Sequence, residues 1–400
     1  MNLGLKELEQ ELYNHCKVSG ILPTSTKGRR LGYLKLILSL FEESDYYPLS
    51  YFSQKVESVA QDINNFLSEY RNNKGRIELT RNGTSAKPYV DLSISLGTIT
   101  EVNRSYILSK HSKVYRAIEE QIYKEGLGDG LICSRLHVNE PAGQLKLFDT
   151  KPNPFRLNLF EQVFFLYHIL ATDALYFWAI VDIVSQGNLQ SERSIRAKFQ
   201  TQILNELKEQ LESKFLSNVE KRNALEIANR IRKWEKPDVY LEHIILPRLN
   251  WLLDLDLIDS EQFSKRLIKL TDSGIRLQMA LSHFHEEISE KSTVISLILE
   301  KSFFQLINYT YNLANSRFST SKIATLEQCV EDSFKYFRTA APNSIAASQA
   351  IFYSCYSMLL QHKSILEFEE AKDLLVNNQF PAYTLDWYKR ENDGSLQRRK

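Results

Sequence analysis

Apolar residues spaced three or four positions apart give residues 236–281 the most regular pattern in the chain. Those between Tyr240 and Leu253 recur at helical steps, which predicts a helix with one apolar side. After a polar break, the apolar run Leu267 to Leu270 predicts a short strand. Thr271 or Asp272 then stands where a side chain would cap a following helix.

The segment from Lys87 to Ile118 repeats this plan. KPYVDL at its start corresponds to KPDVYL in the later stretch, and a helix is expected to end at an apolar corner, Leu96 to Ile99. A polar tip at Asn103 and Arg104 follows, then a strand at Ile107 and Leu108 and a helix from Lys113. The order helix, corner, tip, strand and helix therefore occurs twice.

Both segments resemble winged-helix (winged helix-turn-helix) DNA-binding domains of prokaryotic type, in which a helix lies against a small β-hairpin. The resemblance covers about Leu31 to Ile118 and Ala174 to Leu281. It implies two winged-helix units and binding to double-stranded DNA. By analogy with multi-winged-helix proteins, it also implies a subunit of a larger prokaryotic complex, regulatory or for antiviral defence.

Three short helices are expected before the first copy, at Tyr33 to Phe41, Leu49 to Ala60 and Ile63 to Tyr70, with a strand at Ile77 to Thr80. The longest apolar segment runs from Leu159 to Val184. It contains Glu161, His168, Asp173 and Asp182, which would be costly in hydrocarbon. We therefore expect a buried helix pair, broken near Thr172 and Asp173, and not a membrane span.

Composition supports a mainly α fold. Glycine (14) and proline (10) are scarce in 400 residues, whereas β-sandwiches and barrels need many turns that these residues supply. We expect two winged-helix-like units with small β-hairpins and a helical C-terminal bundle. The length predicts two to three domains. The divisions are 1–125, an N-terminal winged-helix-like domain; 126–156, a Gly/Pro-rich connector; 157–290, a helical region with the second winged-helix-like domain; and 291–400, a helical C-terminal region with a frayed tail from Lys389.

The four cysteines, Cys16, Cys133, Cys329 and Cys355, are scattered and form no C-x-x-C pair, which argues against a zinc ribbon or a disulfide framework. The N-terminal residues form a polar amphipathic pattern without the apolar centre of a signal peptide. Both features favour a cytoplasmic location.

Net charge is only +1, so DNA binding must come from local patches. Between Lys27 and Arg116 there are 14 lysines and arginines against 9 aspartates and glutamates. A helix that Ser191 caps carries two further arginines, three positions apart. The candidate DNA-binding residues are Arg29, Arg30, Arg71, Lys74, Arg76, Arg81, Arg104, Lys110, Lys113, Arg193 and Arg196. The alternative for these groups is a solvated basic surface.

Catalytic and metal motifs are weak. His283 and His285 lie two positions apart and would point away from each other on a helix, so no metal site is expected. Glu370 and Lys372 match the shortest nuclease pattern, yet Ile365 to Leu375 has helical spacing. No phosphate-binding glycine loop is present, and no cofactor is expected. An enzyme whose catalytic residues converge only in three dimensions stays open.

An interaction scaffold is the alternative function. The predicted helix from Tyr240 to Leu253 is very apolar, with Arg248 and Asn250 as its main polar groups, and three aspartates follow it. Such a helix suits contact with protein better than with DNA. We therefore expect a protein partner or a homodimer in either case, with no membrane association.

Overall fold

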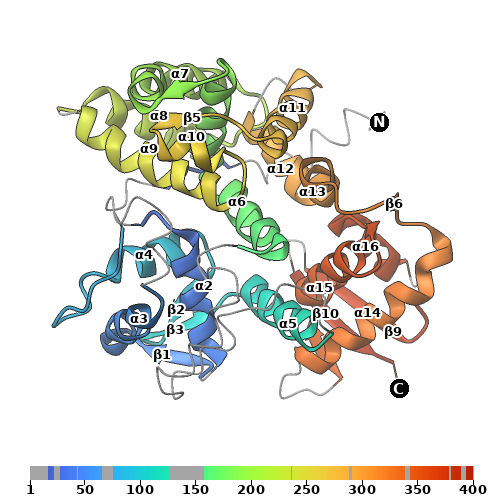
Figure 1. Cartoon of the computed structure of the whole chain (residues 1–400). Coiled ribbons are helices and arrows are strands. Elements are labelled where there is room, and N and C mark those ends of the chain that lie inside the picture. Colours follow the sequence, from blue (N-terminus) through green and yellow to red (C-terminus); the bar gives the residue numbers. More distant parts are fainter. Residues whose placement is uncertain are drawn as a thin grey trace.

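The computed structural model describes residues 17–21, 28–42, 44–64, 75–125, 157–235, 237–287, 291–337, 343–377, 380–388 and 393–399. The protein is mainly helical with small sheets, as expected (Figure 1). The predicted connector at 126–156, Arg71 and Lys74 lie outside these ranges, as does most of the helix expected at Ile63 to Tyr70.

The N-terminal unit comprises α2 (Leu31–Ser39), η1 (Leu40–Glu42), β1 (Tyr46–Pro48), α3 (Leu49–Ile63), α4 (Lys87–Ser95), β2 (Ile99–Val102), β3 (Ser105–Leu108) and α5 (Lys110–Glu125). Its antiparallel sheet has the order β1-β3-β2, with Ile107 opposite both Tyr46 and Thr100. The predicted helix, corner, tip, strand and helix are confirmed here.

The prediction of a strand at Ile77 to Thr80 is wrong. These residues form no strand, because their backbone N–H groups bond to side chains instead of to a neighbouring strand. The N–H of Ile77 donates to the hydroxyl of Tyr33, and that of Glu78 to the hydroxyl of Ser85.

Helix α6 (Leu159–Ser185) begins with a capping box between Asn158 and Glu161 and is kinked at Asp173, where φ is −135° and ψ is 17°. The expected helix pair is confirmed. Asp173 accepts hydrogen bonds from the N–H of Ile21 and from Arg248. Among the described helices α6 alone is long and apolar enough to span a membrane, but 83% of its most apolar window is buried inside the protein.

The middle region comprises β4 (Gln190–Ser191), α7 (Glu192–Glu212), α8 (Asn218–Arg232), α9 (Pro237–Asp254), α10 (Ser260–Ser264), β5 (Leu267–Ile268) and α11 (Asp272–Glu287). The expected helix and strand are confirmed, and β5 pairs with β4. Thr271 caps α11, since its hydroxyl accepts from the N–H of Gly274. A Cβ at Gly274 would lie 2.1 Å from the carbonyl oxygen of Leu257, so this close approach requires glycine.

Three short helical elements lead out of the middle region: α12 (Lys291–Leu297), the π-helix η5 (Ile298–Ser302) and α13 (Phe303–Tyr311). A two-stranded parallel pair, β6 (Ser316–Arg317) with β8 (Ser364–Ile365), and η6 (Thr320–Lys322) come next.

The C-terminal unit comprises α14 (Ile323–Tyr336), β7 (Ser344–Ala346), α15 (Ala347–Leu360), α16 (Phe368–Val376), β9 (Tyr383–Tyr388) and β10 (Asp393–Arg398). Its sheet has the order β7-β10-β9. The frayed tail expected from Lys389 is wrong over β10, which is the central strand and buries Leu396 fully. The expected helical bundle therefore includes a sheet. With β8 left out, because it pairs with β6 outside this sheet, the order α14-β7-α15-α16-β9-β10 matches α2-β1-α3-α4-β2-β3 of the N-terminal unit.

One hydrophobic core runs through all of these parts. In Figure 1 the N-terminal unit, in blue to teal, lies at the lower left, and its last helix, α5, lies beside the C-terminal unit, in orange and red, at the lower right, while α6, in green, lies at the centre. Buried ion pairs join distant segments across this core: Arg30 with Asp254, Lys35 with Glu161, and Arg248 with Asp173.

Candidate nucleic-acid interface

Helix α4 and the β2–β3 hairpin each bring a basic residue of the N-terminal unit to the surface: Lys87, which is not among the sequence candidates, and Arg104, which is. The side of α4 that carries Tyr89, Val90 and Leu92 is buried, and the helix packs against α2. Its other side leaves Lys87 and Ile94 exposed. Gly97, with φ of +69°, ends the helix in the left-handed conformation and turns the chain into β2.

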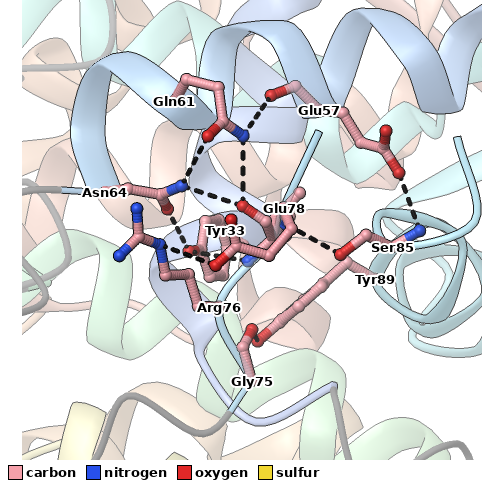
Figure 2. Close-up of polar contacts among 10 residues, drawn as sticks. Tyr33, Glu57, Gln61, Asn64, Gly75, Arg76, Glu78, Ser85 and Tyr89 are labelled. Carbon is pink, nitrogen blue, oxygen red and sulfur yellow. Dashed lines mark hydrogen bonds and ion pairs between the residues drawn. The ribbon is translucent and has the colours of Figure 1, made fainter. Parts of the chain in front are cut away.

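A buried carboxylate fixes the turn that precedes α4. Glu57 of α3 is fully buried and accepts a hydrogen bond from the backbone N–H of Ser85 (2.7 Å; Figure 2). It also accepts from the backbone N–H groups of Thr80 (2.6 Å) and Ala86 (3.2 Å) and from the Thr80 hydroxyl. Four hydrogen bonds satisfy the charge that burial would otherwise penalise. The exposed side chain of Arg81 therefore projects from a fixed backbone.

Two buried tyrosines hold the segment that leads into this turn. The Tyr33 hydroxyl donates to Asn64 Oδ1 (2.6 Å) and accepts from the N–H of Ile77, while the Tyr89 hydroxyl donates to the carbonyl oxygen of Gly75 (2.7 Å; Figure 2). Burial raises the pKa of both tyrosines, so they stay neutral donors. Residues 75–80 are thus anchored to the core of the unit.

The β2–β3 hairpin ends in a two-residue turn made by Asn103 and Arg104. Both have positive φ, 51° and 60°, which is the geometry that suits the twist of a tight hairpin. The carbonyl oxygen of Arg104 accepts from the N–H of Leu49 at 3.2 Å, and its side chain is exposed. The predicted polar tip is confirmed.

The remaining candidates of this unit differ in their surroundings. Lys113 is exposed, like Arg81 and Arg104. Arg76 Nε lies 3.1 Å from Glu78 Oε1, and the exposed Lys110 forms an ion pair with Asp393 of β10. The structure therefore leaves fewer basic groups open to a partner than the sequence contains.

Arg29 and Arg30 do not lie on the surface that was expected for them. Both are buried, each with 3% of its surface exposed. Arg30 pairs with Asp254, which also accepts from the N–H of Leu31 (2.8 Å), and Arg29 lies 4.0 Å from Glu242. Burial raises the pKa of Asp254 to about 6, although Arg30 opposes the shift. Both arginines serve the packing of the N-terminal unit on the middle region.

Arg193 and Arg196 line a groove of about 590 Å³ between the first half of α7 and the start of α9. Ser191 caps α7, as expected, by accepting from the N–H of Ser194 at 3.1 Å. Arg196 forms an ion pair with Glu192, and Asp238 also lines the groove. Figure 1 shows α7 at the top and α4 at the lower left, so the two groups of basic residues belong to different parts of the molecule.

Within the described ranges, no group of three His, Cys, Asp or Glu side chains could hold a metal ion. Glu370 and Lys372 lie on helix α16, so the helical interpretation of this segment is confirmed. Lys372 pairs with Glu369 on the same helix. Neither residue stands on a strand, as the nuclease pattern would need.

Sequence reasoning did not single out Glu57 or the pairing of His111 with His168. Glu57 gives one usable signal: it lies beside Val56 and Ala60 on the apolar side of a predicted helix, where a carboxylate needs partners. The two histidines are 57 positions apart in sequence, and nothing in their spacing brings them together.

No protein-family model, curated protein or solved structure matches the chain.

Proposed function

We propose that the protein binds double-stranded DNA through its N-terminal unit and that this unit is a winged-helix domain. The observation that carries the proposal is the element order α2-β1-α3-α4-β2-β3 together with the sheet order β1-β3-β2. In a helix-turn-helix arrangement the second helix of the pair enters the major groove. That helix is α4, and the β2–β3 hairpin is then the wing.

The charges that support this role are few but well placed. Arg81 lies on the turn before α4, Lys87 begins that helix and Arg104 tips the wing. The positive end of the helix dipole of α4 adds to the attraction for phosphate. Lys87 lies 3.4 Å from Asp91, so DNA phosphates would compete with that exposed pair.

The middle and C-terminal parts contain helices and small sheets in an order that resembles that of the N-terminal unit. The C-terminal unit repeats the order of the N-terminal one, and the middle region has α9, the strand pair β4–β5 and an isolated bridge between Ile258 and Leu270. We infer a chain of related units in which the N-terminal one contacts DNA. A cytoplasmic location and a place in a regulatory or antiviral defence complex belong to the same proposal.

Fluorescence anisotropy with a labelled duplex tests the proposal. Replacing both Arg81 and Arg104 by alanine is expected to weaken binding at least tenfold at low salt, because two phosphate contacts are lost. Arg193→Ala, which removes an exposed arginine from the α7–α9 groove, is the matched control and is expected to bind nearly as the wild type does. Equal affinity of all three proteins would remove the basis for this interface.

A protein-interaction scaffold is the second candidate, because the N-terminal unit also exposes large apolar side chains. Leu79, Ile94 and Val102 are 68%, 37% and 43% exposed. Ile94 and Val102 lie on α4 and β2, the elements assigned to DNA. Size-exclusion chromatography with light scattering tests this function: a dimer that Ile94→Ser/Val102→Ser dissociates would favour docking over DNA binding.

A further inference from the structure

Three parts of the chain meet at a pair of buried histidines. His111 lies in the first turn of α5 and His168 in the first half of α6, with their ring centroids 4.9 Å apart. Helix α15 of the C-terminal unit packs along α5 and brings Phe352 and Tyr356 to the same place. The pair therefore lies where the N-terminal unit, α6 and the C-terminal unit touch.

Aromatic rings enclose the two imidazoles. His111 stacks on Phe352, with centroids 4.3 Å apart, and meets the edge of Tyr167 at 4.5 Å. His168 meets Phe164 at 4.5 Å. Both histidines are buried, so a positive charge on either would be separated from water.

Each imidazole uses one of its two nitrogens. His168 Nδ1 donates to the carbonyl oxygen of Leu96, at the end of α4, over 2.7 Å, and His111 Nε2 lies 3.0 Å from the Tyr356 hydroxyl. In the part of the chain that the structure describes, His111 Nδ1 and His168 Nε2 have no hydrogen-bond partner. A proton added to the pair would thus create a buried N–H group without an acceptor.

Among the residues that the structure describes, no carboxylate compensates a positive charge on either imidazole. Burial, and then the neighbouring His168, lower the pKa of His111 well below its usual value, and burial lowers that of His168 to about 4. Burial raises the pKa of Tyr167 on α6 and of Tyr356 on α15, so both stay neutral. The charge of Glu300 in η5 raises the pKa of Tyr167 further, and Asp393 of β10 forms an ion pair with Lys110 of α5.

We propose that His111 and His168 form an acid-sensitive latch, which holds α15 and the end of α4 against α5 and α6 at neutral pH and releases α15 when the imidazoles are protonated. Opening exposes the imidazoles to water, where they bind protons near pH 6.5. For His168 alone, acidification from pH 7.5 to pH 5 raises the opening constant about 30-fold. Further protonation at His111 acts in the same direction.

Hydrogen exchange followed by mass spectrometry on the full chain tests the latch. Wild type and His111→Phe/His168→Phe are compared at pH 7.5 and pH 5, with each peptide referred to the same peptide of the other protein, so that the intrinsic pH dependence of exchange cancels. Wild type is expected to lose protection in α15 at pH 5 on the order of 30-fold more than the double variant does. His283→Gln, which removes an exposed histidine of α11, is expected to behave as the wild type.

Equal loss of protection in wild type and double variant would overturn the latch. If the double variant does not fold, the ring Cε1–H signals of the histidines in the wild-type protein decide by NMR titration. Two imidazoles that stay neutral to well below pH 6, until the C-terminal unit is released, support the proposal. Titration of all histidines near pH 6.5 in the closed protein would refute it.

Discussion

Three buried ion pairs in this protein join segments far apart in sequence. Arg248 of α9 donates to Asp173, at the kink of α6, from Nε over 2.6 Å and also contacts the carbonyl oxygen of Ile21. The guanidinium lies 4.9 Å from the centre of the Tyr176 ring, a favourable cation–π distance. Removing one partner of such a pair costs more than the pair itself contributes, because the other charge is left without compensation.

Asp173→Ala is therefore expected to lower the free energy of unfolding by about 3–5 kcal/mol, since it leaves Arg248 buried and unpaired. Urea denaturation measures the loss. Glu261→Ala is the matched control, because Glu261 forms an exposed i,i+4 pair with Lys265 and should cost less than about 1 kcal/mol. Comparable losses in the two variants would contradict the account.

Glu367 is a second buried residue with a measurable signature. It accepts hydrogen bonds from the N–H groups of Phe304 (3.0 Å) and Gln305 (2.7 Å) at the start of α13. Burial nevertheless raises its pKa from 4.5 to about 7. The folded state thus holds this proton more tightly than the unfolded state does, so the stabilisation is complete below about pH 4.5 and disappears as the pH rises through 7.

Between pH 4.5 and pH 8 we expect Glu367 to remove about 3 kcal/mol of unfolding free energy as it ionises. The glutamine of Glu367→Gln does not ionise. The unfolding free energy of this variant should therefore fall by about 3 kcal/mol less than that of the wild type between these two pH values. Denaturation of both proteins at several pH values gives the difference directly. A difference that does not depend on pH would show that Glu367 keeps an ordinary pKa.

At the scale of elements, the tip of the β2–β3 hairpin affects folding stability through its backbone and the proposed DNA binding through the side chain of Arg104. Arg104 occupies a left-handed conformation, which costs a residue with a side chain about 1 kcal/mol, whereas glycine adopts it freely. Its guanidinium is exposed at the tip, so its proposed contact with phosphate adds nothing to the stability of the free protein.

Arg104→Gly is expected to leave the unfolding free energy unchanged or to raise it by up to about 1 kcal/mol, since the relief of strain exceeds the entropy cost of glycine. The same change should weaken duplex binding. Arg104→Lys is the control that keeps a positive charge at the tip. If both variants bind DNA as the wild type does, Arg104 has no part in the interface.

Helices of this fold were predictable because their apolar residues recur with the helical period. The pattern between Tyr240 and Leu253 lies within α9, and the apolar run from Leu267 gives β5. Short strands carry less information. Strand β1 has three residues, and β10 has one apolar residue, Leu396, among polar ones, so its central place in a sheet depends on pairing with β7 and β9.

The sequence predicted the candidate interface residues correctly only where long-range contacts do not bury the side chain. Arg81 and Arg104 stand next to turn signals and are exposed, as their positions indicated. Arg30 stands in an equally basic stretch, but the carboxylate that takes it into the core, Asp254, is 224 positions away. No local pattern reveals a contact of that range. The pairing of His168 with His111, 57 positions away, was missed for the same reason.

In the whole molecule, one hydrophobic core includes residues from segments that the sequence analysis assigned to separate domains. The division at residue 125 places Arg30 and Lys35 in one segment and their partners Asp254 and Glu161 in another. The N-terminal unit therefore depends on the rest of the chain for the neutralisation of two buried charges.

A fragment of residues 1–125 is accordingly expected to lack a cooperative unfolding transition, because it exposes the apolar surface that packs on α6 and α9 and leaves two buried cations without carboxylates. Circular dichroism during heating measures this. The full chain should unfold in one main transition. A fragment that melts as sharply as the full chain would show that the unit folds independently.

DNA binding by the N-terminal unit is most directly tested by the salt dependence of duplex affinity for the wild-type full chain. With Arg81, Lys87 and Arg104 each neutralising a phosphate, the logarithm of the association constant should fall with the logarithm of salt concentration with a slope of roughly −3. A slope near zero, or no binding at low salt, would contradict the proposed function.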